Sequence, residues 1–396
     1  MPLVLISGAL ANKPGNGGNA WSRLSWVQGF RQMGFDVLFV EQIRRDQCVD
    51  ESGRPAPFES SVNAKYFQET LDRFGMTQSA ALICEEDLST CGLALQRLEA
   101  LAPQIDILFN IGGHLTHEAI VARAQCRLYY DDDPGYTQIW ATEDSRAARL
   151  DGHDYHYTIG ANIGSPECAI PTAGYTWRHT WPPVVLDDWP TCFGTGLEVL
   201  STVASWRGAY GRVVHNGQTY GQKAHEFRKF IEIPQRTGRA FEIALQIHEA
   251  DSKDRMMLTN HGWHLVDPLA ATPTPDRFRS FVQHSSAEFS VAQGIYVETH
   301  SGWFSDRTVR YLASGKPALV QETGFSRHVP TGTGLLTFGD MAEAMAAVHE
   351  IAGNYPRHAR AARQIAEDHF SSDVVIGRLL NEIGIQAPRN ATGTAQ

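Results

Sequence analysis

One stretch of the chain, residues 298–324, has the features of a ligand-binding unit between two strands. The apolar run Ile295–Val297 before it suits the end of a buried strand. After a polar turn at 300–305, Asp306–Ala313 has the apolar spacing of a short helix, and a Gly-Lys-Pro sequence ends that helix before the strand Ala318–Val320. Open parallel sheets bind ligands at the carboxyl ends of their strands, and the free amides at a helix start favour phosphate. The turn is therefore predicted to hold an anionic ligand.

The turn also resembles the donor-binding box of GT-B glycosyltransferases, in particular that of the plant enzymes that act on secondary products. That box opens His-Cys-Gly-Trp-Asn-Ser and closes Gly-x-Pro. Residues 300–305 read His-Ser-Gly-Trp-Phe-Ser, and residues 315–317 read Gly-Lys-Pro. The resemblance implies a UDP-, dTDP- or GDP-linked sugar donor whose diphosphate is held by His300 and the amides around Ser305. The other donor-site candidates are Ser301, Gly302, Arg307, Glu322 and Thr323.

The box departs from the family pattern at several positions. Thr308 stands where the plant box has its ribose-binding glutamate, and Gln321-Glu322 lies only near the position of the closing acidic-Gln pair. Gly302 and Arg310 occupy the positions of the spaced glutamate pair found in many retaining GT-B enzymes. The resemblance therefore implies the GT-B fold and a nucleotide-linked donor, but neither the plant enzymes' substrates nor their stereochemistry.

The chain length indicates two domains, because 396 residues exceed one ordinary hydrophobic core. We expect an α/β fold in which two Rossmann-like domains face each other across a cleft. Residues 1–185 are predicted to bind the acceptor and residues 186–370 the donor, with the aromatic, proline-rich stretch 175–190 at the hinge. In GT-B folds the last helix crosses back to the first domain, which is expected here for 371–385, and 386–396 is expected to be a disordered tail.

Composition limits the partners of the protein. A net charge of −10 does not favour nucleic acid or an anionic membrane surface, although a local basic groove is compatible with it. Six cysteines without a C-x-x-C motif indicate reduced thiols. No secretory signal is visible, and no window approaches the roughly 18 apolar residues of a membrane span. The sequence predicts a cytoplasmic, metal-independent protein with no membrane span and no cofactor.

A glycine-rich loop follows the first predicted strand, Leu3–Ile6, and ends in Gly17, Gly18 and Asn19 before a helix. Its glycines lack the G-x-G-x-x-G spacing, so a dinucleotide cofactor is not predicted. In GT-B enzymes the corresponding loop reaches into the cleft, and the resemblance makes these three residues candidates for an acceptor-side loop. Inverting enzymes of the plant type carry a catalytic histidine in this loop, which this sequence lacks.

His114 follows two glycines at the end of an apolar strand, where a ligand can approach closely. We interpret it as a catalytic or substrate-orienting residue, with a histidine bonded to the backbone as the alternative. His117 and Glu118 lie nearby, but no third residue at a convincing spacing completes a metal site. A helix is expected over Leu88–Leu101, before this strand.

Three adjacent carboxylates, Asp131 to Asp133, lie at the end of another predicted strand. In one interpretation Asp131 and Asp133 are the metal-binding Asp-x-Asp of a GT-A glycosyltransferase. In the other, Asp133 is an acceptor-side base in a GT-B cleft. A solvated turn ending in proline is the third alternative. The repeated strand-helix pattern of the second half favours the GT-B interpretation.

Two cations flank a polar connection in the second half. Arg207 follows the predicted strand Val199–Ala204, and Lys223 opens the next predicted helix. They resemble the Arg and Lys that clamp donor phosphates in GT-B enzymes, although the connection between them is longer than usual.

The leading prediction is a glycosyltransferase of the hexosyltransferase type, which moves a sugar to a hydroxyl- or amine-bearing small molecule, glycan or modified base. Three alternatives remain at this point. They are a nucleotide-sugar epimerase of the same fold, a metal-dependent GT-A enzyme that uses Asp131–Asp133, and a non-catalytic nucleotide- or glycan-binding protein.

Overall fold

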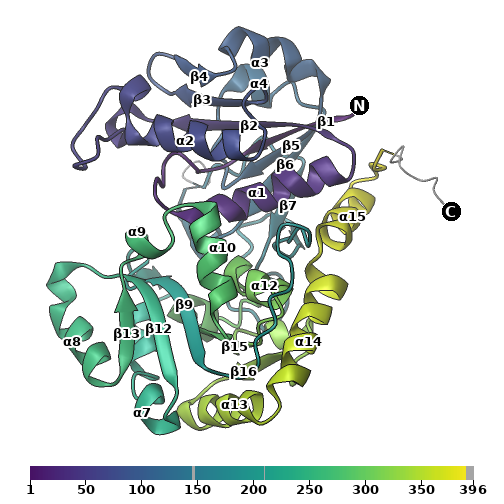
Figure 1. The fold of residues 1–396 in the computed structure, drawn as a ribbon. Helices are drawn as coiled ribbons and strands as arrows, with labels where there is room; N and C mark the ends of the chain where they lie inside the picture. The colour runs from purple at the N-terminus through teal and green to yellow at the C-terminus, as the bar shows by residue number, and fades with distance from the viewer. Residues whose placement is uncertain (145–147, 209, 389–396) are drawn as a thin grey trace.

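The computed structural model describes residues 1–144, 148–208 and 210–388, and it contains two largely parallel β-sheets. One sheet lies in each of two stacked domains, and helix α1 runs between them (Figure 1). The strand order is β4-β3-β2-β1-β5-β6-β7-β8 in the N-terminal domain and β13-β12-β9-β14-β15-β16 in the C-terminal domain. The predicted α/β fold with two Rossmann-like domains is confirmed.

The N-terminal domain holds eight strands and its own covering helices. The strands are β1 Leu3–Ser7, β2 Asp36–Ile43, β3 Ala80–Cys84, β4 Thr90–Gly92, β5 Ile105–Ile111, β6 Cys126–Asp131, β7 Tyr155–Thr158 and β8 Trp177–His179. The α-helices are α1 Gly17–Gln32, α2 Val62–Arg73, α3 Leu95–Leu101, α4 Glu118–Val121 and α5 Tyr136–Glu143.

The C-terminal domain adds a hairpin to its six-stranded sheet. The sheet strands are β9 Val199–Ser205, β12 Ala240–Gln246, β13 Trp263–Val266, β14 Ala287–Ser290, β15 Ala318–Gln321 and β16 Leu335–Phe338, and the hairpin strands are β10 Val213–His215 and β11 Gln218–Tyr220. The helices are α6 Lys223–Arg228, α7 Ile233–Thr237, α8 Ser252–Asn260, α9 Pro268–Ala271, α10 Pro275–His284, α11 Gly294–Glu298, α12 Asp306–Ala313, α13 Met341–Gly353, α14 Tyr355–Ile365 and α15 Ser372–Glu382.

The central strands are apolar along their length because both faces of the sheet are covered. In β1, Val4 and Ile6 belong to the hydrophobic cluster that includes α1, whereas Leu5 belongs to the cluster that includes α3 and α4. All three side chains are fully buried. This burial on both faces explains why the strands could be predicted as short apolar runs.

The apolar run Ile295–Val297 is not the end of a strand, as predicted, but lies in helix α11. The preceding strand β14 ends at Ser290. Ile295 and Tyr296 instead pack in an apolar cluster with Tyr136 of the N-terminal domain. A short apolar run does not distinguish a buried strand from a buried helix, and here the contact between the domains decides in favour of the helix.

The predicted helix Leu88–Leu101 is also wrong in its first half. Leu88 has a left-handed backbone with φ of 59°, and β4 then pairs antiparallel with β3. Only α3 is helical in this range. The connection after Arg207, predicted as polar loop, contains the hairpin β10–β11. Pairing with a neighbouring strand therefore overrode local propensity at both places.

Helix α1 joins the two domains through close backbone contacts. The Gly17 N–H donates to the Thr272 carbonyl over 3.0 Å, and the Trp21 indole donates to the Pro275 carbonyl over 2.8 Å. A Cβ at Gly17 would lie 2.1 Å from the carbonyl oxygen of Thr274. This approach is closer than any side chain permits, which makes glycine necessary here.

Gly17→Ala is therefore expected to lower the free energy of unfolding by about 1–3 kcal/mol, because the added methyl group must push two backbones apart. Gly353→Ala is the matched control, because a Cβ there meets nothing within 4 Å. Urea unfolding of both variants measures the difference. Equal midpoints for Gly17→Ala and wild type would show that the contact is not tight in solution.

The last helix, α15, packs on α1 of the N-terminal domain. A Cβ at Gly29 of α1 would lie 2.5 Å from the Ile376 side chain, and the Ser372 hydroxyl donates to Gln32 over 3.3 Å. Of the predicted tail 386–396, residues 389–396 lie outside the described residues. Among the residues that the structure describes, no helix is long and apolar enough to cross a membrane.

Candidate active site

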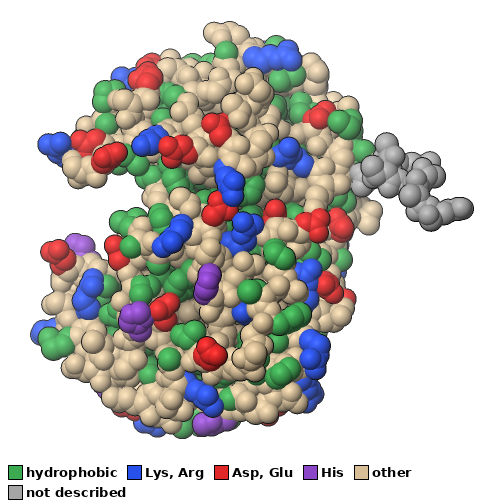
Figure 2. Space-filling view, viewed as in Figure 1, with side chains coloured by type: hydrophobic (Ala, Val, Ile, Leu, Met, Phe, Trp, Pro, Cys, Tyr) green, Lys and Arg blue, Asp and Glu red, His purple; other side chains and the backbone are tan. Residues whose placement is uncertain are grey.

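A cavity of about 320 Å³ lies where β1, β5 and β6 of the N-terminal sheet end. Figure 2 shows a notch between the two domains, on the left of the view. The cavity is lined mainly by loops of the N-terminal domain, with Tyr210 contributed by the C-terminal domain. The lining residues are Asn12, Lys13, Arg23, Gln42, Arg44, Gln47, Glu85, Gly112, His114, Tyr129, Asp131, Asp132, Asp133, Thr137, Trp140, Ala148, Arg149 and Tyr210.

The three carboxylates after β6 have different environments. Asp131 is buried and accepts hydrogen bonds from the side chains of Thr137, Gln138 and Thr158, each at 2.7 Å. It also accepts the N–H of Asp133 at 3.1 Å. These four bonds occupy both of its oxygens, so Asp131 shapes the turn even though it also lines the cavity.

Asp132 pairs with Arg23 of α1 at 3.1 Å, and neutral donors satisfy Asp131. Among the described residues, the Asp133 carboxylate has only the long contact to the Tyr210 hydroxyl at 3.4 Å. The pKa of Asp133 is raised to about 7, first by burial and then by the negative charges of Asp132 and Asp131. A carboxyl group with this pKa can exchange a proton near neutral pH. The structure thus brings the predicted catalytic residue Asp133 into the cavity.

His114 lines the same cavity, so the two predicted catalytic residues lie together. Its pKa is lowered to about 4 by burial and then by the positive charge of Arg23. The imidazole is therefore neutral at physiological pH and can donate or accept a hydrogen bond.

Glu41, at the end of β2, organises the loop after β1, and the sequence analysis missed it. Its buried carboxylate accepts the N–H groups of Leu10, Ala11 and Asn12 at 2.6–2.9 Å. Burial outweighs these bonds and raises the pKa of Glu41 to about 7. A glutamate directly after the apolar run Val37–Val40, still within the buried strand, was the signal that could have identified it. The loop that it holds places Asn12 and Lys13 in the cavity.

The predicted acceptor-side residues of this loop do not line the cavity. Gly17 and Gly18 pack against the C-terminal domain, at Thr274 and Phe278 respectively. The Asn19 side chain donates to the Ala9 carbonyl at 2.7 Å. Because α1 begins at Gly17, the two glycines serve the contact between the domains, Asn19 holds its own loop, and the middle of the loop reaches the cavity instead.

On the donor side, Lys223 and Arg307 approach the carboxyl end of β14. The Lys223 ammonium donates to the carbonyl of Val291 at 2.8 Å. The pKa of Lys223 is lowered to about 7 by burial and then by the positive charge of Arg307. The structure thus holds two cations near one strand end, a position where open α/β sheets bind ligands.

Arg307 is fully engaged within the protein. Its guanidinium donates to Glu288 at 2.6 Å, to the Ser290 hydroxyl at 2.7 Å and to the Val203 carbonyl at 3.0 Å. Glu288 is completely buried, so this pair neutralises a charge beneath the sheet edge. A donor contact by Arg307 stays a prediction.

Arg207 is separate from this pair. Its side chain is 58% exposed and holds Asp251 with two donors, one of them at 2.7 Å. Arg207 follows β9 and Lys223 approaches the end of the neighbouring β14, so the two lie along the same sheet edge. The described contacts do not join them directly.

The turn 300–305 packs against the N-terminal domain. The carbonyls of His300 and Ser301 accept from the side chain and the backbone of Asn162, at 2.9 and 3.0 Å. Gly302 has φ of 74° and donates its N–H to the Thr323 carbonyl at 2.7 Å. A Cβ at Gly302 would lie 2.8 Å from the Asn162 nitrogen. The carbonyls of His300 and Ser301 are therefore used between domains, while the His300 side chain is exposed.

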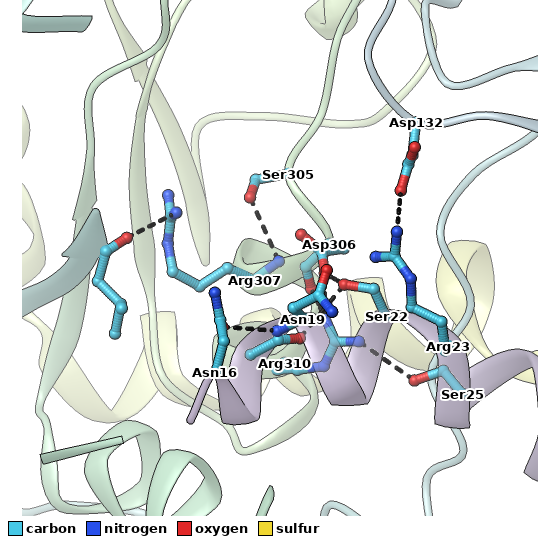
Figure 3. Close-up of polar contacts among 12 residues, drawn as sticks. Asn16, Asn19, Ser22, Arg23, Ser25, Asp132, Ser305, Asp306, Arg307 and Arg310 are labelled. Carbon is cyan, nitrogen blue, oxygen red and sulfur yellow. Dashed lines mark hydrogen bonds and ion pairs between the residues drawn. The ribbon is translucent and has the colours of Figure 1, made fainter. Parts of the chain in front are cut away.

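The start of α12 is occupied by protein groups. Ser305 caps it by accepting the Arg307 N–H at 3.2 Å. Asp306, at the first position, accepts from the Ser22 hydroxyl of α1 and from Arg310 at 2.9 Å (Figure 3). The position predicted for a phosphate at this helix start thus already carries the Asp306 carboxylate. This carboxylate is stabilised by the same amides and helix dipole that would stabilise an anionic ligand.

The last two donor-site candidates are held locally. Glu322 accepts the N–H of Gly324 at 2.5 Å, and the buried Thr323 hydroxyl donates to the Trp303 carbonyl at 2.6 Å. Both residues stabilise the turn after β15 that meets the turn 300–305.

No family model matches the chain, and no curated protein matches it. Solved structures do match over nearly the whole length. An alpha-glucosyltransferase in complex with UDP is 10% identical, with a TM-score of 0.58, 96% of this chain covered and 99% of that chain. HepE of Anabaena in complex with UDP-glucose is 12% identical, with a TM-score of 0.59 and the same coverage. Sucrose-phosphate synthase of Thermosynechococcus elongatus is 10% identical, with a TM-score of 0.55, 97% of this chain covered and 99% of that chain.

The two-sheet architecture and these matches exclude the GT-A alternative for Asp131–Asp133. The four hydrogen bonds on Asp131 agree with that correction. This chain therefore has the GT-B fold of the glycosyltransferases that it matches.

Proposed function

We propose that the protein is a glycosyltransferase that moves a hexose from a nucleotide sugar to an acceptor hydroxyl. The observation that carries this proposal is the cavity at the strand ends of the N-terminal sheet, bordered by Tyr210 of the C-terminal domain, which Asp133, with a pKa of about 7, and a neutral His114 both line. Residues 1–185 would form the acceptor domain, 186–370 the donor domain, and 371–385 the return helix.

The donor is proposed to be a UDP-, dTDP- or GDP-linked sugar. Structural neighbours solved with UDP or UDP-glucose support UDP, and the likeness of residues 300–305 to the plant donor box supports a nucleotide-linked donor of any kind. That likeness carries no claim on the plant enzymes' substrates. Lys223 is the donor-side cation best placed to meet a diphosphate, because a single carbonyl is its partner.

The acceptor is proposed to be rich in hydroxyl groups, as a glycan or small sugar is. Most side chains that line the cavity are charged or carry amides, and only three are aromatic: Tyr129, Trp140 and Tyr210. Flat, apolar acceptors are bound by mainly hydrophobic pockets. A polar lining with a few aromatic walls suits a ring that presents hydroxyls at its edge.

In the proposed reaction, the ionised Asp133 accepts the proton of the acceptor hydroxyl as its oxygen bonds to the anomeric carbon of the donor. The bond from that carbon to the diphosphate oxygen breaks, and the leaving diphosphate keeps the electron pair. Lys223 stabilises the charge that develops on the diphosphate. His114 orients the acceptor by a hydrogen bond.

Melting shifts against a panel of nucleoside diphosphates and sugar nucleotides test the donor part of this proposal, because ligands that bind the folded state raise its apparent stability. Lys223→Ala is expected to weaken binding of the preferred nucleotide by about 10–100-fold, the value of a charge-assisted hydrogen bond. Lys253→Ala, on the exposed face of α8, is the control.

The pH dependence of nucleotide affinity gives a second readout. Lys223 must be protonated to pair with a diphosphate, so affinity is expected to fall as pH rises through about 7, and this fall should vanish in Lys223→Ala. Unchanged affinity in Lys223→Ala would remove the residue from the donor site. Conversion of a donor incubated alone into its epimer would favour the epimerase alternative, and failure to turn over any donor would favour a binding protein.

A further inference from the structure

The connection between β9 and α6 packs against helix α5 of the N-terminal domain. Within residues 210–222, the hairpin β10–β11 places Val213 and Tyr220 in the apolar cluster with Tyr136 and Ile295. Each end of the connection is tied down. The Tyr210 carbonyl accepts from the Gln222 side chain at 3.1 Å, and Arg207 before it holds Asp251. The two predicted donor-side cations, Arg207 and Lys223, therefore border this segment.

Tyr210 reaches from this segment to the N-terminal domain. Its ring lies edge-on to Trp140, with centroids 4.7 Å apart, and 5.1 Å from the ring of Tyr136. Both partners belong to α5, which follows the Asp131–Asp133 turn. The Tyr210 hydroxyl donates to Oδ2 of Asp133 at 3.4 Å. This is a long hydrogen bond, of the kind that tightens when a substrate closes an active site.

The charges around Asp133 make this donor important. Asp131 and Asp132 raise its pKa, and Lys13 of the β1–α1 loop and Arg23 of α1 lower it. Arg23 is already paired with Asp132. Burial and the carboxylate raise the pKa of Tyr210 far above neutrality, so its hydroxyl keeps its proton and can only donate to an ionised Asp133.

We propose that Tyr210 is a positioning residue, which holds the Asp133 carboxylate in its ionised form and in the orientation that faces the acceptor. This inference rests on the proposed function and adds a residue of the donor domain to the acceptor site. It also gives the long connection a role, because the segment bordered by the donor-side cations carries the group that orients the base.

The test measures the protonation of Asp133 directly. Aspartate is labelled with ¹³C at the side-chain carboxyl, the Asp133 resonance is identified by its loss in Asp133→Asn, and the signal is titrated with pH. In Tyr210→Phe the ring and its packing on Trp140 are kept, and only the donor is lost. The midpoint for Asp133 is expected to rise by about one pH unit, the lower range for a hydrogen bond to a charged group.

Tyr220→Phe is the matched control, because the hydroxyl removed belongs to the same segment, residues 210–222, but to a residue that does not line the cavity. Its Asp133 midpoint should equal that of wild type. The same midpoint in Tyr210→Phe and wild type would overturn the inference. In the transfer assay, the acidic limb of kcat/KM should move to higher pH by the same amount in Tyr210→Phe only. If the Asp133 midpoint shifts in Tyr210→Phe but the wild-type protein transfers no sugar, the contact between Tyr210 and Asp133 is supported and the proposed function is refuted.

Discussion

Asp133→Asn is expected to lower kcat/KM for sugar transfer by about 10²–10⁴-fold, the usual contribution of a general base. The substitution keeps the size of the side chain but removes its ability to accept a proton. Nucleotide binding should be unchanged, because Lys223, the proposed diphosphate contact, approaches a different strand end, that of β14. Asp373→Asn, an exposed carboxylate in α15, provides the control.

The pH profile of the wild-type enzyme should reflect the same group. A base must be ionised to act, so with the donor saturating and paired with Lys223, kcat/KM for the acceptor is expected to rise with pH through about 7, the pKa of Asp133, and to level off above it. This rise of kcat/KM with pH should be absent from the residual activity of Asp133→Asn. A variant that retains full activity would transfer the role of base to another group, such as His114, whose lower pKa places its limb near pH 4.

Arg307→Ala is expected to lower the free energy of unfolding by about 3–5 kcal/mol, because it leaves a buried carboxylate unpaired. Glu288 is 0% exposed, and its Oε2 already lacks a hydrogen-bond partner. Removal of the guanidinium takes away the 2.6 Å contact that stabilises its charge. The loss is measured as the shift of the urea midpoint at constant slope.

Two controls test whether the loss of stability comes from the burial of the charge and not simply from the loss of an ion pair. Arg236→Ala breaks an exposed pair with Glu232, whose side chains are 52% and 45% exposed, and should cost at most about 1 kcal/mol. A double variant, Arg307→Met with Glu288→Leu, should recover most of the lost stability, because neither charge then remains buried. A double variant as unstable as Arg307→Ala would contradict the explanation.

The sequence predicted most of the sheet elements because they carry a local signal. Leu3–Ile6, Ile105–Phe109 and Ala318–Val320 are apolar runs between turn residues, and each lies in a buried strand. Helix α12 begins at the predicted residue because Ser305 caps it. The predictions for Ile295–Val297 and for the segment before α3 were wrong, because the structure of each depends on packing or pairing partners outside the segment itself.

The residues of the candidate site also fall into those that a local sequence pattern predicted and those that only distant contacts revealed. His114 and Asp133 were found because each directly follows a strand, and the ends of parallel strands meet at one sheet edge. Glu41 and Tyr210 were not found. Glu41 acts on a loop about 30 residues earlier, and Tyr210 meets Asp133 only because the domains close on each other.

The sequence by itself thus determined two Rossmann-like units, most of their strands and the residues that follow those strands, because apolar periodicity and turn residues act over short distances. Tertiary structure alone decided that Gly17 and Gly18 serve a domain contact, that Arg307 pairs with Glu288, and that a tyrosine from one domain reaches the carboxylate of the other. The contacts of Gly17 with Thr274 and of Gly18 with Phe278 join residues 257 and 260 positions apart, and no local pattern encodes which distant surfaces will meet once two sheets pack together.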